Sequence, residues 1–250
     1  MKIWLKRQFR KLLPRTVRTY RILSGQIRGA SIVTSLHDYP AAVFGWTERP
    51  LLRWFADNVA AGETWLDVGA HYGYTAIALA RLVGSGGRVF AFEPMISTAG
   101  CIGHARMQNG LSQLFVVPLA LADCDSIELR MLPTERGMID QTAKRLTSEP
   151  FLVTSLDSLW PSISGDCQAI HGIKIDVQGM EIYALRGMKS LLKEMRPRLV
   201  VELHRGVDRE ELLSLLAGFG YSREGTPVDP QVREAVPEFL DDRSYSFYAR

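Results

Sequence analysis

The chain carries two acidic residues and a glycine turn where a nucleoside-binding sheet would need them. Asp67 lies near the end of the apolar run 64–68, and the next five residues, Gly69 to Gly73, read Gly-Ala-His-Tyr-Gly before a helical pattern. Glycine lets the backbone approach a ligand closely, and a helix N-terminus offers free N–H groups. Glu93 ends the next strand-like run, 24 residues after Gly69. In doubly wound sheets that position reaches the two hydroxyls of a bound ribose.

Three classes of cofactor could use such a turn. A dinucleotide site favours Gly-x-Gly-x-x-Gly, and a triphosphate cradle ends in Gly-Lys-Ser/Thr, and neither pattern is present. A nucleoside without phosphates remains, and S-adenosylmethionine fits. We expect Asp67 to orient the ammonium group of this ligand, directly or through water, Glu93 to bind its ribose and Asp123 to accept from its adenine amino group. The alternative for each acid is a helix cap or a solvated loop residue.

The surrounding pattern predicts an α/β fold. Short β-branched runs alternate with helical patterns from about residue 50 onward, which is typical of βαβ units and a parallel sheet. We predict strands at 64–68, 88–92, 114–120, 171–175, 198–203 and 245–249, and helices at 51–59, 73–83, 96–108, 181–195 and 209–217. The segment 124–160 breaks this rhythm with an extra strand at 127–131 and a polar loop at 135–148.

The N-terminal segment is basic. Nine Lys and Arg residues precede the first acidic residue, Asp38, whereas acidic residues outnumber basic ones in the rest of the chain. Leu5, Phe9, Leu12 and Leu13 share one side at helical spacing before Pro14. We predict a basic helical cap over residues 1–40 and a cofactor-binding domain over residues 41–250. The cap either packs on the body, or contacts an anionic membrane through residues 1–21, or meets nucleic acid.

Composition excludes several classes of protein. Hydrophobic residues make up 46% and charged residues 23% of the 250 residues, which is ordinary for a globular chain. No apolar run approaches the roughly 18 residues of a spanning helix. Three separated cysteines without a Cys-x-x-Cys pair argue against a disulfide scaffold or a structural zinc site. We therefore expect a cytoplasmic protein, with peripheral membrane contact as the alternative.

An ordered set of motifs resembles the FkbM family of class I S-adenosylmethionine-dependent methyltransferases. The motifs are DVGAHYGYT (67–75), FEP (92–94), ALAD (120–123), SLDSL (155–159), IKIDVQGME (173–181), LRG (185–187) and RP (196–197). The resemblance covers about residues 40–250 and implies a Rossmann-like, seven-stranded sheet with its last strand antiparallel. It also implies methylation of hydroxyl groups on sugars or other small molecules. The cofactor-binding residues are then Asp67, Gly69, Ala70, His71, Gly73, Glu93, Pro94 and Asp123.

Two positions depart from the pattern of the family. The family usually has Asn where His71 stands and Glu where Gln178 stands. His71 keeps a donor that could reach the carboxylate of the cofactor, with a charge that depends on pH. Gln178 lacks a carboxylate on the expected acceptor side.

Three further residues are candidates for catalysis. Asp176 follows one predicted strand, Glu202 lies at the end of another, and His204 comes two residues later. Ligands of open sheets bind beyond the carboxyl ends of the strands, so these side chains could meet near the transferred methyl. We expect His204 to act as the general base and Asp176 to orient it or bind the acceptor. The alternatives are a Mg²⁺ held by all three, or a histidine that only caps the strand.

Glu48 stands in Gly-Trp-Thr-Glu before the first helix of the body and matches a Gly-x-x-Glu of the family. We expect it to line the pocket. The alternative is a first-turn acid favoured by the helix dipole.

Rival functions are a nicotinamide-dependent oxidoreductase of the same topology and a non-catalytic module that binds the cofactor or a membrane. Scattered tryptophans disfavour a nucleic-acid acceptor. The sequence leaves the acceptor, the choice of oxygen or nitrogen, and the oligomeric state open.

Overall fold

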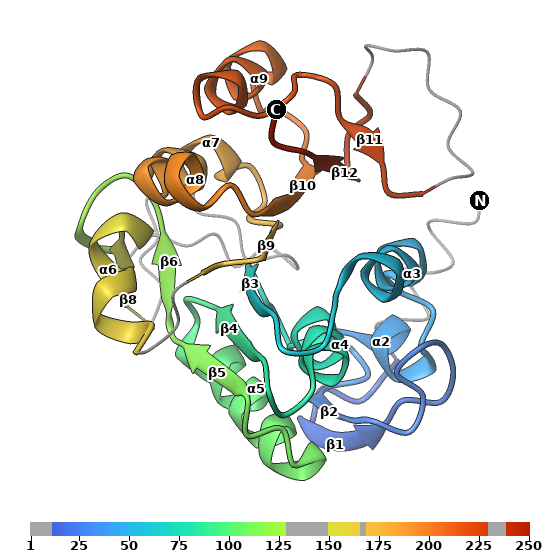
Figure 1. The fold of residues 1–250 in the computed structure, drawn as a ribbon. Helices are drawn as coiled ribbons and strands as arrows, with labels where there is room; N and C mark the ends of the chain where they lie inside the picture. Colours follow the sequence, from blue (N-terminus) through green and yellow to red (C-terminus); the bar gives the residue numbers. More distant parts are fainter. Residues whose placement is uncertain (1–11, 129–149, 166–168, 230–238) are drawn as a thin grey trace.

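A seven-stranded sheet forms the centre of the protein (Figure 1), and the computed structural model describes residues 12–128, 150–165, 169–229 and 239–250. The strand order is β11-β12-β10-β9-β3-β4-β5. Strands β10, β9, β3, β4 and β5 are parallel, and β12 is antiparallel to both of its neighbours. The bounds are β3 (Thr64–Val68), β4 (Arg88–Phe92), β5 (Leu114–Val117), β9 (Gly172–Ile175), β10 (Arg198–Leu203), β11 (Thr226–Pro227) and β12 (Arg243–Phe247). The expected seven strands and the antiparallel last strand are confirmed.

The register brings the predicted site residues together at the carboxyl ends of the parallel strands. Val68 pairs with Phe92 on one side and with Ile175 on the other, and Val201 pairs with Ile175. The residues after these strands therefore emerge together at their carboxyl ends, where an open α/β sheet binds its ligands.

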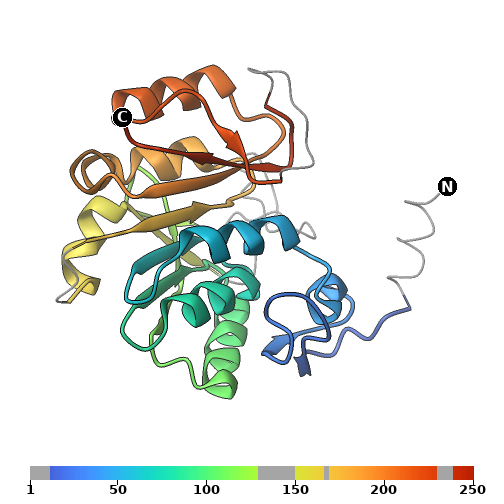
Figure 2. The same cartoon turned by 45° about the vertical axis from the view of Figure 1, so that its right-hand side comes forward.

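Helices cover both faces of the sheet (Figure 2). One face packs on α3 (Arg49–Asn58), α4 (Tyr74–Val83) and α5 (Ile96–Asn109). The other face packs on α6 (Leu156–Ile163), α7 (Glu181–Arg186), α8 (Lys189–Met195) and α9 (Arg209–Gly218). Neighbouring strand residues alternate between the two cores, as the period of a strand requires: Trp65 packs on the first face and Leu66 on the second.

Two predicted elements are each divided in the structure. The predicted strand 114–120 is β5 and then β6 (Leu119–Leu121), separated by Pro118. Strand β6 pairs with β8 (Phe151–Thr154) in a second sheet that also holds β7 (Ser126–Glu128). The predicted helix 181–195 is α7 and α8, which are separated at Gly187. A Cβ on Gly187 would lie 1.9 Å from the carbonyl oxygen of Ala122, so the break accommodates a close approach of two backbones.

The described part of the N-terminal segment is not a helical cap. Strands β1 (Arg18–Arg21) and β2 (Ser31–Thr34) form an antiparallel hairpin, followed by the short α2 (Pro40–Phe44). The side chain of Asn109 at the end of α5 bonds both the N–H and the carbonyl of Ser31. The hairpin therefore packs on the body. Of the predicted apolar helix stripe, Leu5 and Phe9 lie outside the described residues, whereas Leu12 and Leu13 are described and are not in a helix. The division at residue 40 stays a prediction.

The polar loop at 135–148 and Cys167 also lie outside the described residues, as does the end of the extra strand predicted at 127–131. Within the described ranges, no helix combines the length and the apolar character needed to cross a bilayer.

Candidate active site

The glycine turn after β3 is fixed by backbone contacts that only glycine permits. Gly69 has φ +81°, and a Cβ there would lie 1.9 Å from the carbonyl oxygen of Asp176. The N–H groups of Gly69 and Ala70 both donate to the carbonyl of Phe92 at the end of β4. Gly73, with φ +81°, is the N-cap of α4, and no side chain caps this helix. The first amides of α4 therefore have no side-chain cap, and their contact with a ligand stays a prediction.

Glu93 lies against the same turn. Its Oε2 atom accepts from the backbone N–H of His71 at 2.9 Å, and its Oε1 atom accepts from that of Met95 at 3.1 Å. Pro94, which lies between Glu93 and Met95 in the chain, has no N–H that could compete for this carboxylate. Burial raises the pKa of Glu93 to about 7, although both hydrogen bonds favour the charged form. This carboxylate suits ribose hydroxyls, which could donate to its remaining lone pairs.

His71 and Asp123 have different surroundings. His71 has φ +50°, and its ring packs 5.0 Å from Tyr39 and 4.5 Å from Tyr72, measured between centroids. Asp123 follows β6, and its carboxylate lies 3.8 Å from the Arg186 guanidinium. An adenine contact by Asp123 and a carboxylate contact by His71 stay predictions.

Asp67 is engaged by other residues of the protein, and its predicted contact with the ammonium of the cofactor, directly or through water, stays a prediction. It is fully buried, its Oδ2 atom accepts from the hydroxyl of Thr75 at 2.6 Å, and its Oδ1 atom lies 3.0 Å from the ammonium of Lys174. Because Thr75 belongs to the first turn of α4, Asp67 ties this helix to the sheet.

Lys174 is a site residue that the sequence analysis missed. Its ammonium donates to the carbonyl of Gly69 at 3.0 Å and lies 3.4 Å from Oδ2 of Asp176. Burial opposes its charge, but Asp67 and Asp176 raise the pKa of Lys174, so the side chain stays cationic. A lysine within the apolar strand Gly-Ile-Lys-Ile was the available signal, since buried lysines are nearly always paired. It links the cofactor turn to the acceptor side.

His204, Asp176 and Glu202 converge as predicted. The Nε2 atom of His204 lies 3.4 Å from Oδ1 of Asp176 and 3.5 Å from Oε1 of Glu202. The Nδ1 atom lies 2.6 Å from Oε1 of Glu181, a fully buried residue at the start of α7. Glu181 belongs to the motif that carried the family resemblance, yet only the fold reveals it as the partner of His204.

Gln178 completes this cluster. With φ +54°, it directs its side-chain amide toward Nε2 of His204 at 2.8 Å and Oδ1 of Asp176 at 3.3 Å. With Nδ1–H donating to Glu181, Nε2 of His204 becomes an acceptor, which is the tautomer that a general base needs. The neutral amide of Gln178 therefore bridges the imidazole of His204 and the carboxylate of Asp176. This contact requires no charge at position 178.

The crowding of charges shifts several pKa values. Burial works against the charged form of His204, but its hydrogen bond to Glu181 and the carboxylates of Asp176 and Glu202 raise its pKa. Asp176 is also desolvated, yet Lys174 and His204 lower its pKa. Burial, and then repulsion from Asp176 and Glu48, raise the pKa of Glu202 to about 7. Strongly shifted groups at the end of a sheet are typical of a catalytic site.

Glu48 belongs to the same cluster. It precedes α3 with φ +51°, and its side chain does not cap that helix. Burial and the nearby Asp176 raise its pKa. The pocket-lining role of Glu48, and the alternative of an acid favoured by the helix dipole, both stay predictions.

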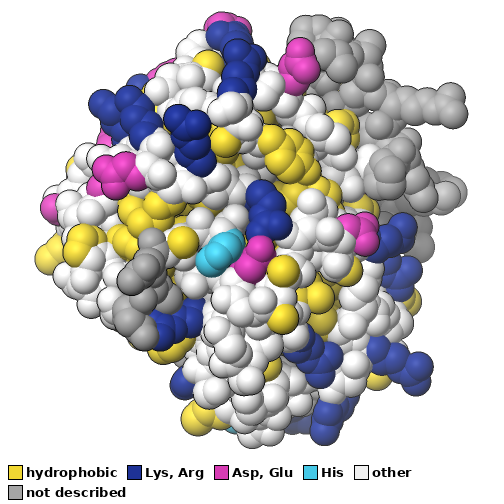
Figure 3. All heavy atoms as spheres, in the orientation of Figure 1, with side chains coloured by type: hydrophobic (Ala, Val, Ile, Leu, Met, Phe, Trp, Pro, Cys, Tyr) yellow, Lys and Arg dark blue, Asp and Glu magenta, His cyan; other side chains and the backbone are white. Residues whose placement is uncertain are grey.

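The metal alternative has a geometric basis. One ligand atom from each of Asp176, Glu202 and His204 lies within 4.8 Å of the others. The Lys174 ammonium already lies 3.4 Å from Asp176, so the chain itself supplies a positive charge beside that carboxylate. Figure 3 shows one histidine, one acidic and one basic side chain as neighbours near the centre of a face whose other Lys and Arg lie mostly toward its rim.

Comparisons with known proteins match the part of the chain that carries these residues. The methyltransferase FkbM domain family matches residues 67–223, the span from Asp67 to beyond His204. Hexuronic acid methyltransferase AglP of Haloferax volcanii is 24% identical over 183 residues, which is 73% of each chain.

Solved structures give two further likenesses. A methyltransferase FkbM from Methylobacillus flagellatus has 18% identity and a TM-score of 0.49, and the match covers 84% of this chain but 53% of that one. This chain thus spans about half the length of that relative. The O-methyltransferase TomG from Streptomyces achromogenes, in complex with S-adenosylmethionine, has 14% identity and a TM-score of 0.46, with 80% and 78% covered.

The residues fit the cofactor, because a glycine turn, an uncapped helix start and a buried carboxylate lie side by side. The match over 67–223 decides between methyl transfer and the nicotinamide alternative. The chain belongs to the FkbM methyltransferase domain family and is an S-adenosylmethionine-dependent methyltransferase.

Proposed function

We propose that this protein methylates a hydroxyl oxygen of a sugar-like small molecule. The observation that carries the proposal is the buried pair of His204 and Glu181, whose 2.6 Å contact occupies Nδ1 of the imidazole. Nε2 accepts from the side-chain amide of Gln178 at 2.8 Å, a contact that the acceptor hydroxyl replaces when it binds. An alcohol must lose its proton as its oxygen attacks, whereas a carboxylate is already ionised and needs no base. The hexuronic acid named for the relative AglP supports a carbohydrate as the substrate class.

The side chains divide the work between binding and proton transfer. S-adenosylmethionine, when bound, supplies a methyl carbon on a sulfonium that leaves as a neutral thioether. The glycine turn and Glu93 hold the nucleoside, and Asp176 and Gln178 set the position of the acceptor hydroxyl. His204 takes the hydroxyl proton at Nε2 as the oxygen–methyl bond forms. Alignment of the reacting atoms at about 3 to 3.5 Å contributes a large part of the acceleration.

The test is turnover with a defined panel of acceptors. The purified protein is incubated with S-adenosylmethionine and methyl glycosides, and S-adenosylhomocysteine is quantified. We expect a methyl ether, which survives mild alkali, whereas a methyl ester is hydrolysed. A panel that yields only esters, or no S-adenosylhomocysteine at all, contradicts the proposal.

The same assay tests the metal alternative. Because the Lys174 ammonium already lies 3.4 Å from Oδ2 of Asp176, we expect a chelator to leave the initial rate unchanged within twofold. A loss of activity that added Mg²⁺ restores would favour the metal site instead.

We further propose that the protein works in the cytoplasm at an anionic membrane surface, with residues 1–21 in contact. Arg18 and Arg21 are exposed on β1, and beside the hairpin Trp46 is 64% exposed and stacks on Phe44 at 4.7 Å. Exposed tryptophan beside arginine is typical of an interfacial surface. The full chain should sediment with vesicles containing phosphatidylserine and not with phosphatidylcholine alone, and Trp46→Ala should weaken this binding. Equal behaviour with both vesicles would contradict the proposal.

A further inference from the structure

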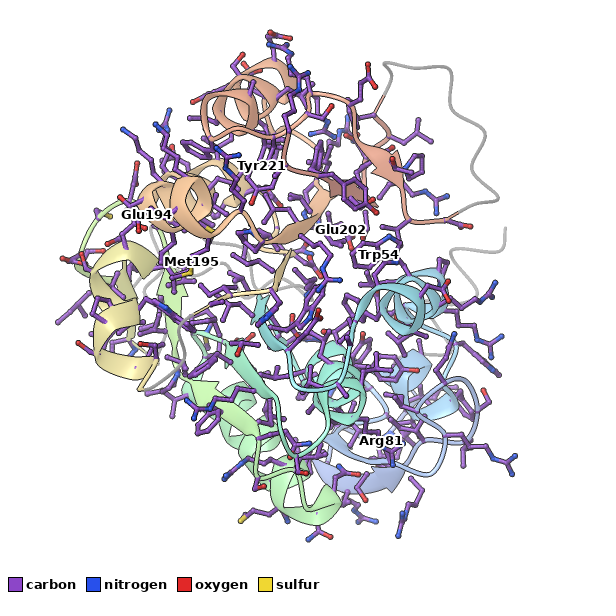
Figure 4. All side chains as sticks on the ribbon, viewed as in Figure 1. Trp54, Arg81, Glu194, Met195, Glu202 and Tyr221 are labelled. Carbon is purple, nitrogen blue, oxygen red and sulfur yellow. The ribbon has the colours of Figure 1, made fainter. Side chains whose placement is uncertain are left out.

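A cavity adjoins the acceptor side of the catalytic cluster. It measures about 200 Å³ and lies between the start of α3, the end of β10 and the β11–β12 hairpin. Its lining includes Glu48 and Glu202, the two carboxylates that also surround Asp176. In Figure 4, Glu202 lies toward α3, where Trp54 is labelled, and far from Glu194. The volume is below the 300–1,000 Å³ of drug-sized pockets and suits a single ring.

The walls of this cavity combine two kinds of surface. Pro50, Leu51, Pro227 and Val228 supply apolar carbon atoms. The carboxylates supply only acceptors of hydrogen bonds while ionised. A sugar ring offers the matching pair, since its C–H groups can lie on an apolar wall while its hydroxyls donate to carboxylates.

The balance of charge in the cavity is negative. Among the residues that the structure describes, Glu48, Glu202, Asp229 and Asp242 line it together with one cation, Arg243. The guanidinium of Arg243 already lies 3.9 Å from the carboxylate of Asp229. Glu202 also accepts from the hydroxyl of Ser244 at 3.4 Å, which holds it at the wall. A further carboxylate on a ligand would therefore meet like charges in a partly buried space.

We propose that this cavity is the acceptor subsite and that it selects a sugar ring without a carboxylate over a uronate. The inference rests on the proposed oxygen methylation and makes it more specific. It also separates this chain from its relative AglP, whose name specifies a hexuronic acid. The hydroxyl to be methylated would lie at the end of the ring nearest Glu202 and His204.

The experiment compares two probes that differ at C6, which is a hydroxymethyl group in methyl glucoside and a carboxylate in methyl glucuronide. Binding of each is measured by calorimetry with the full-length protein saturated with S-adenosylhomocysteine, and KM is measured where turnover occurs. We expect the wild type to bind the neutral glycoside at least about tenfold more tightly. This corresponds to about 1.4 kcal/mol.

The variant Asp229→Asn/Asp242→Asn removes two carboxylates and frees Arg243 for a ligand. We expect it to shift the preference toward the glucuronide by about tenfold, while its affinity for S-adenosylhomocysteine is unchanged. Asn at position 242 also tolerates the left-handed φ of +54°. The control Asp57→Asn/Glu194→Gln makes the same change in net charge at exposed positions outside the cavity and should leave the preference unaltered.

Two results would overturn the inference. One is equal binding of both glycosides by the wild type; the other is the same preference in the cavity variant as in the wild type. If the double variant fails to bind S-adenosylhomocysteine, Asp242→Asn alone serves, with an expected shift of a few-fold. Failure of the proposed function is distinct, because it would be an absence of methyl ether product despite the expected binding preference.

Discussion

The imidazole of His204 and the carboxylate of Glu181 meet at 2.6 Å, although one follows β10 and the other begins α7. His204 is 4% exposed and Glu181 is fully buried. The same Oε1 atom of Glu181 also accepts from the backbone N–H of Gly179 at 3.0 Å. The imidazole ring is thus held through its Nδ1 atom, and its Nε2 atom is directed toward Asp176 and Glu202.

This contact predicts the pH dependence of turnover. A general base must be neutral, and the surrounding carboxylates raise the pKa of His204 above the usual 6.5 of a histidine. The rate should therefore rise with pH through a midpoint above 6.5. Glu181→Gln removes one of these charges, so its midpoint should move to lower pH, and its maximal rate should fall because the ring is less well oriented.

The measurement is kcat against pH for the wild type, Glu181→Gln and His204→Ala. The last variant should lose about 10² to 10⁴-fold in kcat. All three should bind S-adenosylmethionine alike in calorimetry, since none of these residues lies at the glycine turn. A Glu181→Gln profile that coincides with the wild type would leave Glu181 without a positioning role.

Glu93→Ala should weaken the binding of S-adenosylmethionine by about 1 to 3 kcal/mol. The variant loses the ribose acceptor and also leaves the amides of His71 and Met95 without their partner. Isothermal titration of the cofactor measures the effect, with Glu194→Ala as an exposed control. Unchanged affinity in Glu93→Ala would show that the ribose lies elsewhere.

Glu93 should also make stability depend on pH. Its pKa is raised from 4.5 to about 7 by burial, so the folded state binds its proton more tightly than the unfolded state does. This contribution to stability is complete below pH 4.5 and is lost as pH rises through 7. Relative to the wild type, Glu93→Gln should therefore gain about 3 kcal/mol between pH 4.5 and 8.

Denaturant titrations of both proteins across this range give the difference in unfolding free energy. Comparison within the pair cancels the contributions of His204 and Glu202, which both proteins share. A difference that stays constant with pH would mean that the carboxyl group of Glu93 titrates normally in the folded protein.

Two glycine-to-alanine variants should have opposite effects on stability. Gly69→Ala adds a Cβ at 1.9 Å from a backbone oxygen and requires a φ of +81°, so it should lose about 3 kcal/mol or more of folding free energy. Gly103→Ala lies inside α5 with nothing within 4 Å, so it should gain about 0.5 to 1 kcal/mol. Urea unfolding of the wild type and the two variants gives their free energies of unfolding. A stable Gly69→Ala protein would contradict the tight turn.

The central strands could be predicted from the sequence because local pattern and burial agree there. The expected bounds of β3, β4 and β10 match the structure. Once the strands are parallel and in register, residues at their carboxyl ends must meet, and this is why Asp176, Glu202 and His204 were found together.

The other features of the fold and of the site depend on contacts between segments that are distant in the sequence. The break at Gly187 reflects the backbone of Ala122, and the side-chain partners Lys174 and Glu181 become apparent only when β9, β10 and α7 are placed together. The hairpin of β1 and β2 was missed because both strands have only four residues and β1, Arg-Thr-Tyr-Arg, continues the basic pattern of the N-terminal segment. The sequence position of Asp67 likewise does not reveal that Thr75 and Lys174 engage its carboxylate.

The central claim is that one edge of the sheet holds the cofactor turn beside the cluster around His204. A crystal structure with S-adenosylhomocysteine tests it most directly. The account predicts both ribose hydroxyls within hydrogen-bond distance of Glu93, and the thioether sulfur directed toward Asp176 and His204. A nucleoside bound away from Glu93, or a sulfur that faces away from His204, would contradict it.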